Sequence, residues 1–169
     1  MQHTRNGKPP PVFRSIDHVG IAVHDLDASI AWYVEKFGMR VVHSEINEDQ
    51  GVREAMLAVG DHGPRLQLLA PLHDDSPIAK FLAARGEGLH QLAYAVDDVE
   101  DAAATLRARG IEPLYDKPRR GTADSRVNFV HPKSAGGILV ELVEEADGPV
   151  STERSAGRSA GSGSPDGEK

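Results

Sequence analysis

Residues 16–23 read IDHVGIAV, and residues 89–96 read LHQLAYAV. In each short apolar run, alternate residues fall on opposite faces, which is typical of a β-strand. Each run also carries a histidine. His18 and His90 are 72 residues apart, and we interpret them as occupying matching places in the two runs. The pair predicts that the chain contains two copies of one module, each opening with a strand.

The segments that follow the two runs repeat as well. Residues 26–37 have helical spacing of apolar side chains and end at Gly38, and residues 99–106 have the same spacing and end at Gly110. Three strand-like segments then complete each module: 40–46, 52–59 and 65–70 in the first, and 112–115, 126–130 and 138–143 in the second. We therefore predict an α+β fold built from two tandem βαβββ modules.

The domain organisation follows from this repeat. We expect a flexible, Pro-rich arm over 1–15, the first module over 16–72 and the second over 89–143. Between them, 73–88 should hold a connecting helix capped by Ser76, with Pro77 at its first position and Gly86 at its end. From 144 to 169 the sequence is rich in Gly and Ser with almost no apolar residue, which predicts a disordered tail.

Composition excludes several classes of function. The net charge of −7 makes nucleic acid an improbable partner, and the absence of cysteine excludes disulfides, thiolate metal sites and a cysteine nucleophile. No apolar run approaches the roughly 20 residues that cross a bilayer. The polar N-terminus has no signal-peptide pattern, so we expect a cytoplasmic protein without a membrane partner.

Four polar residues interrupt the apolar strands at related places. The first module offers His18 and Gln67, and the second offers His90 and Glu141. A polar side chain is costly to bury without a partner, so we expect the four to converge. Two imidazoles and two oxygen donors suit a first-row divalent ion such as Co²⁺, Mn²⁺, Ni²⁺, Fe²⁺ or Zn²⁺. The alternative is that each histidine is an ordinary core or surface residue.

The order of these motifs resembles the methylmalonyl-CoA epimerases of the vicinal-oxygen-chelate superfamily. The resemblance covers residues 15–144 and is most specific at 114–121 (LYDKPRRG) and 126–142 (RVNFVHPKSAGGILVEL). It implies that the two modules curl into a cup-shaped mixed sheet around a divalent metal, Co²⁺ first among the candidates. It also implies methylmalonyl-CoA as substrate, a role in propionate metabolism and a homodimer.

The resemblance assigns roles to individual residues. Those matching His18, Gln67, His90 and Glu141 would bind the metal, and Glu54, in GVREAM, would share acid–base catalysis with Glu141. Inverting C2 requires a base on each face of the carbon, and a metal on the thioester oxygen would stabilise the enolate.

Other charged residues are open to more than one interpretation. Glu45 and Glu48 compete with Glu54 for the role of base, but we expect both to be turn-like and exposed. Contacts to the CoA phosphates or the substrate carboxylate are expected from Lys117, Arg126 and Lys133, or else these lie in a solvated surface region.

Two other functions remain open on the sequence. One is a glyoxalase-type lyase on the same scaffold, acting on a glutathione hemithioacetal. The other is a metal-free protein that binds or sequesters small molecules, including drugs. A dioxygenase is disfavoured because it would use two histidines and one carboxylate, whereas Gln67 adds a fourth ligand here.

Overall fold

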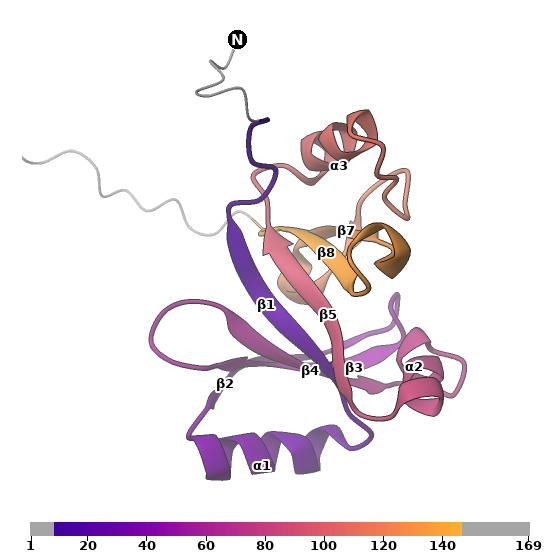
Figure 1. Cartoon of the computed structure of the whole chain (residues 1–169). Helices are drawn as coiled ribbons and strands as arrows, with labels where there is room; N and C mark the ends of the chain where they lie inside the picture. The colour runs from indigo at the N-terminus through magenta and orange to yellow at the C-terminus, as the bar shows by residue number, and fades with distance from the viewer. Residues whose placement is uncertain (1–8, 147–169) are drawn as a thin grey trace, which may run out of the picture.

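The computed structural model describes residues 9–146, which form one eight-stranded mixed sheet in the order β2-β3-β4-β1-β5-β8-β7-β6 (Figure 1). The sheet curls into a half-barrel, and the element order repeats as predicted, which confirms the α+β fold. The elements are β1 (Ser15–Ala22), α1 (Leu26–Phe37), β2 (Arg40–Asn47), β3 (Val52–Ala58), β4 (Arg65–Pro71), α2 (Pro77–Arg85), β5 (Gly88–Ala95), α3 (Val99–Ala108), β6 (Arg119–Arg120), β7 (Arg126–Val130) and β8 (Leu139–Glu144), with short 3-10 helices η2 (Thr122–Asp124) and η3 (Pro132–Ser134).

The first strand of each half lies at the centre of the sheet. β1 pairs in parallel with β4, β5 pairs in parallel with β8, and β1 and β5 run antiparallel side by side (Figure 1). Hydrogen bonds therefore continue from one half of the chain into the other. The first and last strands of both halves meet in the middle, and their inward side chains can share one site.

The helices divide the two faces of the sheet between them. On β4, Leu68 packs with α1, whereas the neighbouring Leu69 packs with α2, so these helices lie on opposite faces. α3 packs on β7 and β8 through a separate cluster that contains Val99, Leu106 and Leu142. α2 covers only one end of the inner face, which leaves the rest of that face for polar residues. No helix within 9–146 combines the length and the apolar character needed to cross a membrane.

Helix ends follow local chemistry. The Asp25 side chain accepts a hydrogen bond from the Ala28 N–H at the start of α1, and Gly38 ends the helix with φ 68°. Ser76 caps α2 in the predicted way, with Pro77 in its first turn and Gly86 at its end.

The structure corrects three sequence-based predictions. The strand predicted over 112–115 is wrong: only Pro113 forms an isolated bridge there, with Val130, and the edge strand is β6. Proline has no N–H to donate to a ladder, which explains the break. Part of the predicted arm is packed, since Phe13 stacks on Tyr94 at 4.4 Å between ring centroids. Glu144 closes β8 instead of starting a tail. The rest of the predicted arm and tail, 1–8 and 147–169, lies outside the described residues.

Candidate active site

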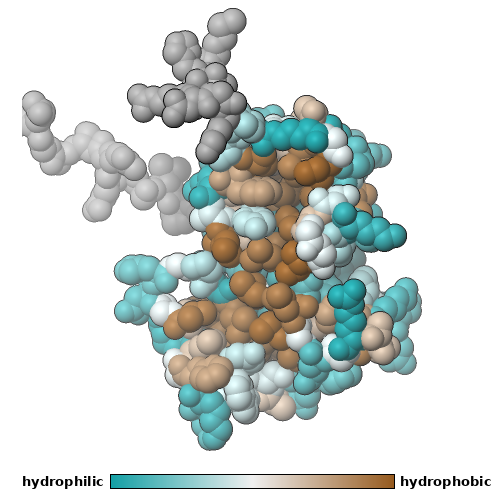
Figure 2. Space-filling model, in the orientation of Figure 1, coloured by the Kyte–Doolittle hydropathy of each residue, from teal (hydrophilic) through white to brown (hydrophobic). Residues whose placement is uncertain are grey.

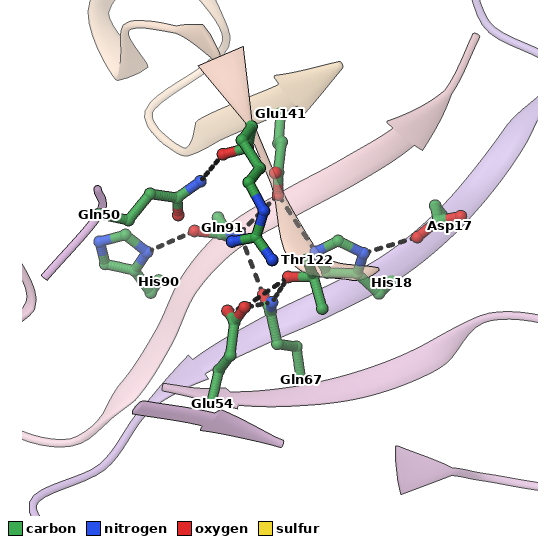
Figure 3. A network of polar contacts seen from close by, with 10 residues as sticks. Asp17, His18, Gln50, Glu54, Gln67, His90, Gln91, Thr122 and Glu141 are labelled. Carbon is green, nitrogen blue, oxygen red and sulfur yellow. Dashed lines mark hydrogen bonds and ion pairs between the residues drawn. The ribbon is translucent and has the colours of Figure 1, made fainter. Parts of the chain in front are cut away.

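Three of the four predicted metal ligands converge on the inner face of the sheet (Figure 3). His18 comes from β1, Gln67 from β4 and Glu141 from β8, and all three are buried. His18 Nε2 lies 3.1 Å from Glu141 Oε2. A fourth buried side chain, Gln91 of β5, joins them: its amide nitrogen donates to Glu141 Oε2 at 2.6 Å and to Gln67 Oε1 at 3.2 Å. We call these four residues the inner cluster.

The strand register shows that His90 does not match His18. Gly20 pairs with Gln67 in the first half, and Ala93 pairs with Glu141 in the second. His18 lies two residues before Gly20, and Gln91 lies two residues before Ala93. The structural counterpart of His18 is therefore Gln91, and the interpretation that placed His90 there is wrong.

A bulge in β5 explains the difference. Between the pairs Gly20–Gln91 and Ile21–Leu89, β5 carries one extra residue, His90. The His90 imidazole Nδ1 lies 2.9 Å from the Gln91 amide oxygen, and its ring packs edge-on against Phe81 at 4.8 Å. Burial lowers the pKa of His90. His90 therefore contacts the inner cluster through Gln91 alone.

Glu54 lies on β3 beside the inner cluster and is 1% exposed. Its carboxylate accepts hydrogen bonds from the Gln67 amide nitrogen and the Thr122 hydroxyl, both at 2.9 Å. Burial raises the pKa of Glu54 to about 7; the Thr122 hydrogen bond opposes this, and the charges of Glu45 and Glu141 add to it. A carboxyl with a pKa near neutrality is suited to both taking and giving a proton.

His18 is held between two carboxylates. Its Nδ1 lies 2.6 Å from Asp17 Oδ2, on the side of the ring opposite Glu141. Burial lowers the pKa of His18, but the two carboxylates outweigh burial and raise it to about 9. In the absence of a cation, His18 is therefore a protonated imidazole that links Asp17 to Glu141.

Thr122 is a site residue that the sequence analysis missed. It lies in η2 of the second half, yet its hydroxyl contacts Glu54 and also accepts from the Gln67 amide at 2.8 Å. The next two residues, Ala123 and Asp124, have positive φ values of 53° and 60°, which is uncommon for residues other than glycine. A loop residue with no periodic pattern gives no sequence signal of this contact.

Glu45 holds the Thr122 loop in place. Its carboxylate accepts a hydrogen bond from the Ala123 N–H at 3.0 Å and pairs with His43 and Arg120. Glu45 lies in β2 and its side chain is 14% exposed, so the expectation that it is turn-like and exposed is wrong. Glu48 does lie in a turn and is exposed.

One cavity reaches the inner cluster, and a second lies beside His90. One of about 240 Å³ is lined by His18, Thr122 and Glu141 among others. The other, of about 420 Å³, is lined by similar numbers of apolar and polar residues, among them Leu69, Phe129, Leu139 and His90. The smaller cavity therefore opens onto Glu141, whereas the larger cavity comes no nearer to the inner cluster than His90.

The predicted substrate-binding cations are not gathered at the cluster. Arg126 lies on the outer face, where it pairs with Glu100 at 2.6 Å and Glu144 at 3.0 Å, because the alternation of β7 turns its neighbour Val127 inward. Lys133 lies exposed in η3, and Lys117 in the loop before β6. The cation that does line the larger cavity is Arg119, whose guanidinium lies 3.8 Å from the Tyr115 ring centroid.

The donor set fits a divalent cation that accepts oxygen ligands. Within 9–146, no group of three or more His, Cys, Asp or Glu side chains is arranged for a metal. The inner cluster instead combines one imidazole, one carboxylate and two amides. Amide and carboxylate oxygens are good ligands for hard divalent ions.

Comparison with known proteins agrees with the fold. Residues 17–129 match the glyoxalase/bleomycin resistance protein/dioxygenase superfamily. The crystal structure of methylmalonyl-CoA epimerase from Mycobacterium tuberculosis is 52% identical, with a TM-score of 0.79, over 86% of this chain and 97% of that one. A Streptomyces coelicolor methylmalonyl-CoA epimerase variant in complex with 2-nitronate-propionyl-CoA is 47% identical, with a TM-score of 0.77, over 80% of this chain and 99% of that one.

A curated relative gives the same result. The ethylmalonyl-CoA/methylmalonyl-CoA epimerase of Cereibacter sphaeroides is 36% identical over 129 residues, which are 75% of this chain and 95% of the relative. The chain therefore belongs to the glyoxalase/bleomycin resistance protein/dioxygenase superfamily and, within it, to the methylmalonyl-CoA epimerase family.

Proposed function

We propose that this protein interconverts the 2R and 2S epimers of methylmalonyl-CoA, with one of the carboxylates Glu54 and Glu141 removing the C2 proton and the other returning a proton to the opposite face. The observation that carries the proposal is the buried Glu54 carboxyl, which has a pKa near 7 and is linked through Gln67 and Gln91 to Glu141. Family membership supports the substrate, since the Streptomyces coelicolor relative is bound to a propionyl-CoA analogue. The reaction would take place in the cytoplasm, within propionate metabolism.

The chain's own groups account for the proton transfers. Ionised Glu54 takes the C2 proton of one epimer, and the C–H electron pair delocalises into the thioester to form an enolate. Thr122 and Gln67 hold the Glu54 carboxylate in place. Glu141, which must carry a proton at the start of this half of the reaction, then delivers it to the opposite face of C2; this inverts the centre and leaves Glu54 protonated and Glu141 ionised. The other epimer reacts by the same steps with the two carboxylates exchanged.

The proposal includes a divalent metal ion held by His18, Gln67 and Glu141. Such an ion is typical of the superfamily, and when bound it would supply Lewis-acid stabilisation of the enolate oxygen. Co²⁺ is the ion favoured by the sequence resemblance, with Mn²⁺, Ni²⁺, Fe²⁺ and Zn²⁺ as alternatives.

We also propose a homodimer. An apolar band crosses the middle of the face that carries β1 and β5 (Figure 2). Ile16 of β1 and Leu89 of β5 are exposed. Trp32 and Phe37 of α1 add exposed aromatic surface, at 47% and 61%. Exposed apolar surface that is contiguous is typical of a protein interface. Light scattering should give a mass twice that of the chain, and Leu89→Lys should lower this mass to that of a single chain.

The test of the function is turnover of pure (2R)-methylmalonyl-CoA in D₂O. The protein should produce the 2S epimer and replace the C2 proton by deuterium. A glyoxalase-type lyase would instead convert the hemithioacetal of methylglyoxal and glutathione, and a binding protein would turn over neither compound. Absence of epimerisation by metal-loaded protein would reject the proposal.

A further inference from the structure

Gln91 occupies the place in the second half that His18 occupies in the first. His18 lies two residues before Gly20, which pairs with Gln67 of β4. Gln91 lies two residues before Ala93, which pairs with Glu141 of β8. The Gln91 side chain is 5% exposed and points into the inner cluster, whereas His90 reaches only the Gln91 amide (Figure 3). A buried amide at the symmetry-related position of a ligand is placed to be a ligand itself.

The backbone opposite Gln91 is shaped to admit this side chain. A Cβ atom on Gly20 would lie 2.5 Å from Gln91 Cγ and 3.1 Å from its Cδ, so only glycine leaves room there. The packing directs the amide between Glu141 and Gln67, where its nitrogen donates to both. The partial positive charge of the N–H groups on that nitrogen lies among the oxygen atoms, where a small cation would also be favoured.

We infer that Gln91, and not His90, completes the metal-binding set, giving one imidazole and three oxygen donors. The inference rests on the proposed metal-dependent function. A half-turn of the Gln91 amide would bring its oxygen beside the oxygens of Gln67 and Glu141, an arrangement that a cation stabilises and that is repulsive without one.

His90 is suited to support both positions of the amide. It faces the Gln91 oxygen at 2.9 Å, where Nδ1–H can donate. After the half-turn it would face the Gln91 nitrogen, and the other tautomer of the neutral ring can accept. His90 is thus a positioning residue for Gln91.

The types of ligand atom at the site determine which metal ion it prefers. Imidazole favours Co²⁺, Ni²⁺ and Zn²⁺, whereas amide and carboxylate oxygens suit Mn²⁺ and Mg²⁺. Because it has a single imidazole, the site should bind Co²⁺ only slightly more tightly than Mn²⁺. Gln91→His should increase the ratio of Co²⁺ to Mn²⁺ affinity by about tenfold or more, and His90→Gln should leave that ratio unchanged.

The decisive experiment counts imidazole ligands by pulsed EPR. Chelator-treated full-length protein is loaded with one equivalent of Mn²⁺, and ¹⁴N couplings are recorded for the wild type and for variants whose folding is checked by circular dichroism. We expect one coupled imidazole in the wild type and in His90→Ala, none in His18→Ala, and two in Gln91→His. Calorimetric titration with Mn²⁺ and Co²⁺ gives the affinity ratio on the same samples.

Three results would overturn the inference. These are two coupled imidazoles in the wild type with one lost in His90→Ala, an unchanged count in Gln91→His, or no Mn²⁺ bound to the wild type. Epimerisation is measured separately, so each part can fail alone. Turnover with two coupled imidazoles would reject the ligand assignment only, whereas one coupled imidazole without turnover would reject the function.

Discussion

The Thr122 hydroxyl donates a hydrogen bond to Glu54 Oε1 at 2.9 Å, and it does so from the opposite half of the chain. The bond favours the ionised carboxylate and so opposes the effect of burial on the pKa of Glu54. Glu45, by binding the Ala123 N–H, fixes the loop that carries Thr122. The second half of the chain thus tunes the carboxyl, supplied by the first half, that we propose as a base.

Removing this hydroxyl should lower the fraction of Glu54 that is ionised, and so able to take a proton, at neutral pH. Thr122→Val retains the side-chain shape but loses the donor, so the pKa of Glu54 should rise further. We expect kcat/KM at pH 7 to fall about tenfold and its rise with pH to move to higher pH. Thr122→Ser, which keeps the hydroxyl, is the matched control and should retain the wild-type pH profile. An unshifted profile in Thr122→Val would show that the hydroxyl does not tune Glu54.

Glu54 should lower the stability of the folded protein at high pH. Its pKa is about 7 in the fold against an ordinary value of 4.5, so the folded chain binds the proton more tightly than the unfolded chain does. The free energy of unfolding therefore falls between pH 4.5 and 7 by up to about 3 kcal/mol from this group.

Glu54→Gln removes this titration. Chelator-treated variant and wild type should unfold at similar denaturant concentrations at pH 5, and the variant should be the more stable at pH 8. Glu48→Gln, at an exposed turn, should show no such difference between the two pH values. Equal stability of Glu54→Gln and wild type at pH 8 would contradict the raised pKa.

Metal binding at His18 should release a proton. The pKa of His18 is about 9 without a cation, so its imidazole must lose a proton before it can act as a ligand at pH 7. Calorimetry of Mn²⁺ binding in two buffers of different ionisation enthalpy should show close to one proton released at pH 7 from this group, and the release should decline as the pH rises through 9. Asp17→Asn removes a carboxylate that raises the pKa of His18, so the release should decline at lower pH than in the wild type. A pH dependence of the release that is unchanged in Asp17→Asn would remove His18 as its source.

The fold was largely predictable because period-2 and period-3.6 patterns report which residues face a core. The 112–115 region was not, since its apolar residues contact β7 through a bridge at Pro113 without a ladder. Packing of Phe13 on Tyr94 was also invisible in a Pro-rich segment, where no periodicity marks a buried residue.

The convergence of side chains was predictable where polar residues interrupt regular strands, as at His18, Gln67 and Glu141. It was not predictable at β5, because two histidines suggested an alignment that a single bulge residue shifts by one position. In a strand, such a shift exchanges the residue that occupies a given place. Thr122 was missed for another reason: its contact with Glu54 depends on how a loop folds back between the two halves.

The central claim is that two carboxylates act on opposite faces of one carbon, and Glu54→Gln tests it most directly. Each pure epimer of methylmalonyl-CoA is incubated with the metal-loaded variant in D₂O, and deuterium at C2 and configuration are measured together. We predict that epimerisation falls by at least about 100-fold, while one epimer, and only one, still exchanges its C2 proton with retention. Epimerisation at the wild-type rate, or equal exchange of both epimers, would contradict the account.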